Sequence, residues 1–170
     1  ELYEKLVINR AVIWREYLEK LIHEERKNEE AISETRRTVE NYLNNAIEAY
    51  PNNTMAKANK LWLHYIWAKY KDDYSISIRE SSILLTELEE SLKRVPTYKE
   101  KEAVLETIAV TKRILGWSIT KHFSTLFNRY QKSGARSDLE QAVAYLETCP
   151  KNCPDLDLKH NSIGLFTDAL

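Results

Sequence analysis

The sequence predicts an all-α domain, and three observations lead to this prediction. The 170 residues include only three glycines and four prolines, whereas average usage would supply about twelve and about eight, so the residues that hairpins and tight turns need are scarce. Apolar side chains recur at three- and four-residue spacing along almost the whole chain, which is the period of a helix. The hydrophobic content of 43% suffices for a core, since a domain of this length buries roughly 70% of its unfolded surface. We therefore expect one helical domain over residues 1–170.

Two apolar stripes predict the first two helices. The first stripe covers residues 6–22, and the second covers residues 32–50. Pro51 ends the second helix, because proline disfavours helical geometry in the residue before it. Between the stripes, residues 23–30 are almost all charged and contain neither glycine nor proline. Two interpretations stay open here: a short turn near Asn28, or one helix that continues.

Capping signals place the next helices. Asn53 or Thr54 should cap a third helix, which ends near Asp72. A Ser or Thr followed three residues later by Glu forms a capping box, which is typical of the start of a helix. Three such boxes predict the starts of later helices: Ser77 with Glu80, Thr97 with Glu100, and Ser137 with Glu140.

Prolines and glycines mark the remaining boundaries. Pro96 ends the fourth helix, Gly134 ends the fifth, and Gly116 is the one weak point within the fifth. A short helix then reaches Cys149, and a last helix begins near Pro154. Short joints make neighbouring helices antiparallel. The sequence thus predicts seven or eight antiparallel helices.

Aromatic pairs recur in the motif W-x-x-Y. Residues three apart lie on one helix face, so each pair presents a broad aromatic ridge to a neighbour. A pair of core aromatics on an amphipathic helix would give the same pattern. The three pairs are Trp14 with Tyr17, Trp62 with Tyr65, and Trp67 with Tyr70.

The surroundings of the second pair resemble the half-a-tetratricopeptide (HAT) repeat, a relative of the tetratricopeptide repeat. The pattern comprises, in order, Arg36 and Arg37, Ala46 and Ile47, Pro51, and then Trp62 with Tyr65. Residues 126–150 look like a second helical pair, whereas residues 75–116 fit neither consensus. The resemblance implies a short right-handed α-solenoid of stacked helix pairs. It also implies a scaffold role, since HAT proteins are mostly scaffolds in RNA-processing assemblies.

Stacked helix pairs predict a binding surface. Each pair buries one face only against the next pair, so the stack leaves a concave side free for partners. The chain begins at Glu1 and stops within an apolar helical pattern. We therefore expect a fragment of a larger protein whose work is to hold partners.

Positive charge gathers in one segment, although the net charge of the chain is −1. Residues 107–136 contain no acidic side chain. Clustered cations act through their summed field, so this segment could meet RNA, an acidic protein, or the acidic helix expected over residues 72–90 of the same fold. The candidate contact residues are Lys112, Arg113, Lys121, Arg129 and Lys132.

Trp67 is a further candidate partner-binding residue. It lies about 140° around its helix from Trp62, at about 100° per residue. Both tryptophans are buried only if neighbours cover this helix on two sides, which is the interpretation we favour. Otherwise Trp67 is an exposed anchor, of a residue type that often dominates interfaces.

The sequence lacks the motifs of common catalytic and metal sites. Three isolated glycines cannot form a phosphate-binding loop, and the four histidines occur in neither H-E-x-x-H nor E-x-x-H. Cys149, Cys153 and His160 would need a fourth ligand and closer cysteine spacing to bind zinc, so reduced thiols are the expectation. We expect no enzymatic activity, no cofactor, no metal and no small-molecule substrate.

The sequence leaves three function classes open. The first is a protein–protein interaction scaffold of a larger intracellular complex, nuclear or cytoplasmic. No signal-peptide pattern occurs at the start, and no apolar run approaches the roughly 18 residues that a membrane span needs. The second is a helical repeat that binds RNA through residues 107–136. The third is a closed helical bundle around an apolar ligand.

Overall fold

The computed structural model describes residues 2–24 and 27–147, which contain six α-helices and no strand. The all-α prediction is confirmed. The predicted count of seven or eight helices differs from the six in the described residues, because residues 98–133 form one helix and the helix expected near Pro154 lies outside the described residues. The helices are α1 (Leu2–His23), α2 (Glu29–Ala49), α3 (Thr54–Lys71), α4 (Ser75–Leu92), α5 (Tyr98–Ser133) and α6 (Arg136–Glu147).

Side-chain caps fix the starts of α2, α3 and α5. Asn28 accepts a hydrogen bond of 3.1 Å from the backbone N–H three residues later and so caps α2. Since α1 ends at His23 and α2 begins at Glu29, the interpretation as one continuing helix is wrong. Asn53 caps α3 in the same way, at 2.8 Å. Thr97 Oγ1 accepts the Glu100 N–H at 3.3 Å and also donates to the Glu100 carboxylate. Thr97 is therefore the N-cap of α5, at the position where the predicted capping box places it.

The other two predicted capping boxes lie inside helices. α4 begins at Ser75, whose N–H is accepted by the Asp73 carboxylate at 3.0 Å. Ser77 is therefore an interior residue, and its buried hydroxyl lies 2.8 Å from that of Ser118 in α5. Ser137 is the second residue of α6. The prediction is wrong at these positions because α4 begins at Ser75 and α6 begins at Arg136, each before the serine that was predicted to cap it.

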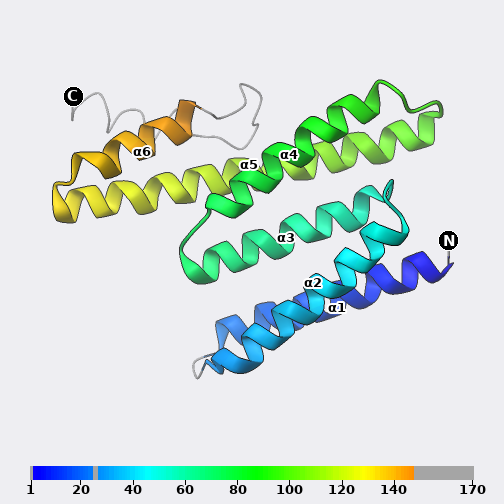
Figure 1. The fold of residues 1–170 in the computed structure, drawn as a ribbon, viewed down its shortest axis with the longest axis horizontal. Coiled ribbons are helices and arrows are strands. Elements are labelled where there is room, and N and C mark those ends of the chain that lie inside the picture. Colours follow the sequence, from blue (N-terminus) through cyan, green and yellow to red (C-terminus); the bar gives the residue numbers. More distant parts are fainter. Residues whose placement is uncertain (1, 25–26, 148–170) are drawn as a thin grey trace.

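α5 is one uninterrupted helix of 36 residues. Gly116, the expected weak point, is buried within it. α4 lies along the N-terminal part of α5 and α6 lies along its C-terminal part (Figure 1), so tertiary packing outweighs the low helix propensity of glycine. Gly134 ends α5 in the left-handed conformation, with φ of 66°.

α3 lies in the middle of the array, between the α1–α2 pair and the α4–α5 pair (Figure 1). Most of its buried apolar residues pack into two separate cores. Leu63 and Ile66 pack with α1 and α2, whereas Leu61 and Ala68 pack with α4 and α5. Consecutive helices run antiparallel. Neighbours therefore cover α3 on two sides, while a right-handed solenoid stays a prediction.

Candidate functional site

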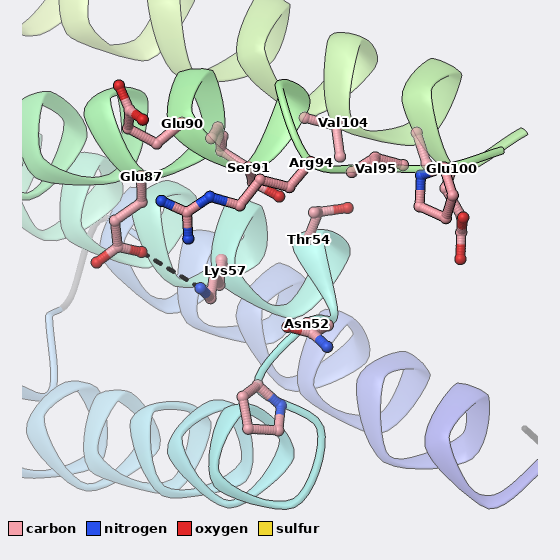
Figure 2. A pocket seen from close by; sticks show the side chains of 14 residues that line it. Asn52, Thr54, Lys57, Glu87, Glu90, Ser91, Arg94, Val95, Glu100 and Val104 are labelled. Atoms are coloured by element: carbon pink, nitrogen blue, oxygen red, sulfur yellow. Dashed lines mark hydrogen bonds and ion pairs between the residues drawn. The ribbon is translucent and has the colours of Figure 1, made fainter. Parts of the chain in front are cut away.

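A groove of about 590 Å³ lies where the α2–α3 turn meets the end of α4 and the start of α5 (Figure 2). Thr54 and Lys57 from α3 line one side, and Glu87 and Arg94 from the α4 region line the other. Lys57 Nζ lies 3.3 Å from Glu87 Oε2. Glu87 and Glu100 stand toward opposite ends of the groove in Figure 2. The hollow thus presents charges of both signs.

A second hollow, of about 240 Å³, continues the first between α3 and α4. The two hollows share Lys57 and Glu87. Ile83 of α4 is half exposed beside the buried Leu84, and Ile47 of α2 closes the far side. We call the combined hollow the α3–α4 groove; its main contributors are Lys57, Lys60 and His64 from α3 and Glu80, Ile83 and Glu87 from α4.

His64 is the titratable group within this groove. Burial is the largest cause that lowers its pKa below 6.5, and Lys60 acts in the same direction. Glu40 and Glu80 raise this pKa but do not reverse the shift. The imidazole is therefore neutral at pH 7. The groove therefore has an uncharged side chain at His64, in addition to the lysines of α3 and the carboxylates of α4 that line it.

The structure divides the candidate cations into separate groups. Lys112 Nζ lies 3.6 Å from Glu89 Oε1 of α4. This lysine therefore pairs with the acidic helix of the same fold, which was one of the three alternatives. Lys121, Arg129 and Lys132 lie together around a depression of about 360 Å³. Arg113 is exposed and does not line this depression. Three of the five predicted cations thus share one surface.

Asp72 lies in the same depression and was not predicted to belong to it. Its carboxylate accepts a hydrogen bond of 2.9 Å from Thr125 Oγ1, which ties the end of α3 to α5. Asp72 adopts a positive φ of 53° at this end of α3. Its negative charge partly offsets the field of Lys121 and Arg129, which weakens the depression as a phosphate site.

Trp67 is half-buried against α1 and α2, while Trp62 packs with α4 and α5. The Arg36 guanidinium carbon lies 4.6 Å from the centre of the Trp67 ring, and Lys71 Nζ lies 5.2 Å from it. Such cation–π contacts hold the ring within the fold. Neighbours cover α3 on two sides, as the favoured interpretation requires, but both tryptophans are half-buried and not buried. A role for Trp67 in partner binding stays a prediction.

The described residues form no metal-binding cluster and no membrane-spanning helix. They contain no group of three His, Cys, Asp or Glu side chains placed to hold a metal ion. Cys149, Cys153 and His160 lie outside these residues. None of the described helices combines the length and the apolar character that crossing a membrane requires.

Comparison of the chain with models of known protein families, with curated proteins and with solved structures finds no match in any of the three. The resemblance to HAT repeats therefore stays a prediction from the sequence. Two surfaces bear on function: the α3–α4 groove, and the depression lined by Lys121, Arg129 and Lys132.

Proposed function

We propose that this chain is a non-catalytic scaffold that binds a protein partner through the α3–α4 groove, as part of a larger intracellular complex of the RNA-processing kind in which HAT proteins serve. The observation that carries the proposal is the groove itself. It is an open hollow between helices, and it offers apolar and charged side chains together. Recognition of an amphipathic helix in a groove uses this combination.

The charges of the groove favour a partner helix that carries both signs. Glu80 and Glu87 lie on the α4 side, one turn to either side of the half-exposed Ile83. Lys57 and Lys60 lie on the α3 side. A partner helix with an apolar residue over Ile83, cations toward α4 and carboxylates toward α3 would complement this surface. The Lys57–Glu87 pair is partly solvated, so its exchange for partner contacts costs little.

A pair of matched substitutions tests the groove. Ile83 and Leu105 expose similar fractions of their side chains, 50% and 52%, but Leu105 does not line the groove. Affinity capture with the 170-residue chain, with and without nuclease, identifies the bound proteins, and binding of the purified partner is then measured. Ile83→Glu should weaken that binding at least about tenfold, as burial of an unpaired carboxylate predicts, while Leu105→Glu should leave it unchanged. Equal binding by both variants contradicts the groove as the binding surface.

A second candidate function, binding of RNA, rests on the depression lined by Lys121, Arg129 and Lys132. Three phosphate contacts to a single strand would give a slope of about −2 for log affinity against log salt concentration. Charge reversal at Lys121 and Arg129 should then abolish retention of RNA. If both variants retain RNA as the wild type does, this surface does not bind it. Binding that persists after nuclease and hardly responds to salt favours the protein partner.

The third class, a closed bundle around an apolar ligand, finds less support. The hollows of the described residues are open to solvent, and charged side chains such as Lys57, Glu87 and Lys121 line them. An apolar ligand prefers an enclosed pocket with few polar groups. We therefore do not propose this function.

A further inference from the structure

The outer face of α1 carries an apolar stripe that the other described helices leave exposed. The inner face packs into the core through Ile8, Ala11 and Leu18, each at most 4% exposed. Large apolar residues gathered on one face are more than the scattered single ones that are normal for a surface. The stripe consists of Tyr3, Leu6, Ile13 and Tyr17, with exposed fractions of 68, 58, 66 and 47%.

The spacing of this stripe is that of a helix–helix seam. Positions 3, 6, 10, 13, 17 and 20 alternate steps of three and four residues, as the a and d positions of a heptad do. Arg10 fills the one charged position in the middle, and its guanidinium carbon lies 5.1 Å from the centre of the Tyr42 ring of α2. The charged end of Arg10 is thus held toward α2, and its aliphatic stem continues the seam.

The position of α1 leaves this seam open. α1 lies at one end of the array and contacts α2 and α3 (Figure 1). A shallow hollow of about 480 Å³ on its outer side is lined by α1 residues alone, among them Ile13, Glu16 and Tyr17. Inner helices of the array are covered on two sides. α1 has two apolar faces, and other helices cover only one of them.

We propose that a second copy of this chain covers the stripe, with the two α1 helices antiparallel about a two-fold axis. In this register the a and d positions of one copy meet d and a positions of the other. Leu6 then lies against Tyr17 of the second copy, and Arg10 lies against Ile13 of the second copy. The contact is the same for both copies, so it closes as a dimer and does not propagate.

The charges on α1 select a second copy in this direction. A parallel pairing would place Lys20 against Lys20 of the second copy, with like charges facing. The antiparallel pairing sets Lys20 against Tyr3 of the second copy instead. It also brings the Glu16 carboxylate of one copy beside the stretch of the second copy that carries Asn9 and Arg10. The seam is therefore complementary to itself only when the helices are antiparallel.

The size of the stripe sets the strength of this dimer. The stripe runs about 21 Å along the helix from Tyr3 to Tyr17, and a strip of this length about 10 Å wide covers roughly 200 Å². That is well below the area of about 800 Å² per partner that stable interfaces bury. We infer a weak dimer that dissociates on dilution. The stripe is separate from the α3–α4 groove, because α1 contributes no lining residue to that groove, so this proposal does not depend on the proposed function.

Sedimentation velocity of the full 170-residue chain over a range of about 1 µM to about 1 mM tests the dimer. The mean mass should rise with concentration from 20.0 kDa toward twice that value. Leu6→Glu and Ile13→Glu should keep the chain monomeric throughout, because each puts a carboxylate into the seam. Leu105→Glu, on α5, should associate as the wild type does. A wild type that stays monomeric, or a Leu6→Glu variant that associates normally, overturns the proposal.

Cysteine cross-linking tests the direction of pairing. Leu6→Cys and Tyr17→Cys are made separately in a chain whose Cys149 and Cys153 are replaced by serine. Under oxidation, an equal mixture of the two variants should give a disulfide-linked dimer, whereas each variant alone should give none. A dimer from Leu6→Cys alone indicates parallel pairing and overturns the antiparallel register. Absence of any cross-link in the mixture also overturns the antiparallel register.

Discussion

The hydroxyl groups of Ser77 and Ser118 share a hydrogen bond of 2.8 Å in the buried contact between α4 and α5. Neither side chain is exposed to solvent, so water cannot replace a lost partner. Small side chains also let the two helices approach closely at this point. The pair therefore couples the packing of α4 against α5 to the satisfaction of two buried polar groups.

Removal of one hydroxyl of this pair should destabilise the fold. Ser77→Ala should lower the free energy of unfolding by about 1–3 kcal/mol, because Ser118 is left with a buried, unsatisfied hydroxyl. The double variant with Ser118→Ala should lose less than the sum of the two single variants, since no polar group is then stranded. Urea denaturation measures this cycle. The exposed Ser124→Ala should cost less than about 0.5 kcal/mol, and purely additive losses at Ser77 and Ser118 would contradict the coupling.

Asn53 is predicted to be the most sensitive of the asparagine caps. Its side chain caps α3, and its Nδ2 donates to the Glu4 carboxylate of α1. Asn53→Ala removes both contacts and should cost about 1–2 kcal/mol of stability, whereas Asn28→Ala removes only a cap and should cost about 1 kcal/mol or less. Urea denaturation compares the two. Asn53→Asp keeps the cap but places a carboxylate against Glu4, so its free energy of unfolding should lie between those of the wild type and Asn53→Ala. Equal losses of stability at Asn28 and Asn53 would count against the α1 contact.

Local signals predicted most of the helix boundaries. The caps at Asn53 and Thr97 act within one turn of chain, so neighbouring residues alone identify them. Ser77 has the same capping spacing as Thr97, yet it lies buried against α5. That difference depends on which helix packs against the position, and the local sequence pattern carries no information about this. Gly116 is the converse case. Glycine has a low helix propensity, but the packing of neighbouring helices on α5 keeps this position helical.

The candidate surfaces were less accessible to sequence reasoning. Lys112 and Lys121 are nine residues apart, or about 180° around a helix, so their spacing alone places them on opposite faces of α5. The structure agrees, with Lys112 at Glu89 and Lys121 at the depression. The α3–α4 groove needs residues from several helices, and no local spacing indicates which helix supplies its opposite wall. Ile83, which lies between Glu80 and Glu87 at helical spacing, is a signal that an outer face of α4 is partly apolar.

Gly134 should be replaceable at a modest cost. It ends α5 at a φ of 66°, where a Cβ atom would meet nothing within 4 Å. Gly134→Ala should therefore cost only the backbone penalty of the left-handed conformation, about 1–2 kcal/mol. Gly134→Asn should cost less, because asparagine tolerates this conformation better. Urea denaturation gives both values. A loss of more than about 3 kcal/mol for alanine would mean that α6 packs more closely on this turn than the structure has it.

His122 links the stability of the fold to pH. Burial is the largest cause that lowers the pKa of His122 below 6.5; Asp73 opposes this shift, Arg129 adds to it, and Asp72 opposes it. In the unfolded chain the imidazole has its ordinary pKa, so below about pH 6.5 the unfolded state binds more protons than the folded state. The contribution of His122 to stability is therefore present above that pH and is lost as the pH falls through the folded pKa.

The free energy of unfolding should accordingly fall between about pH 7.5 and about pH 5.5, and His122→Gln should make this fall shallower because it removes the buried titratable group. Urea denaturation at intervals of about half a pH unit measures both slopes. His64, whose pKa is also lowered by burial, remains in every variant and sets the residual slope. Parallel profiles for the wild type and His122→Gln would show that protonation of His122 is not coupled to unfolding.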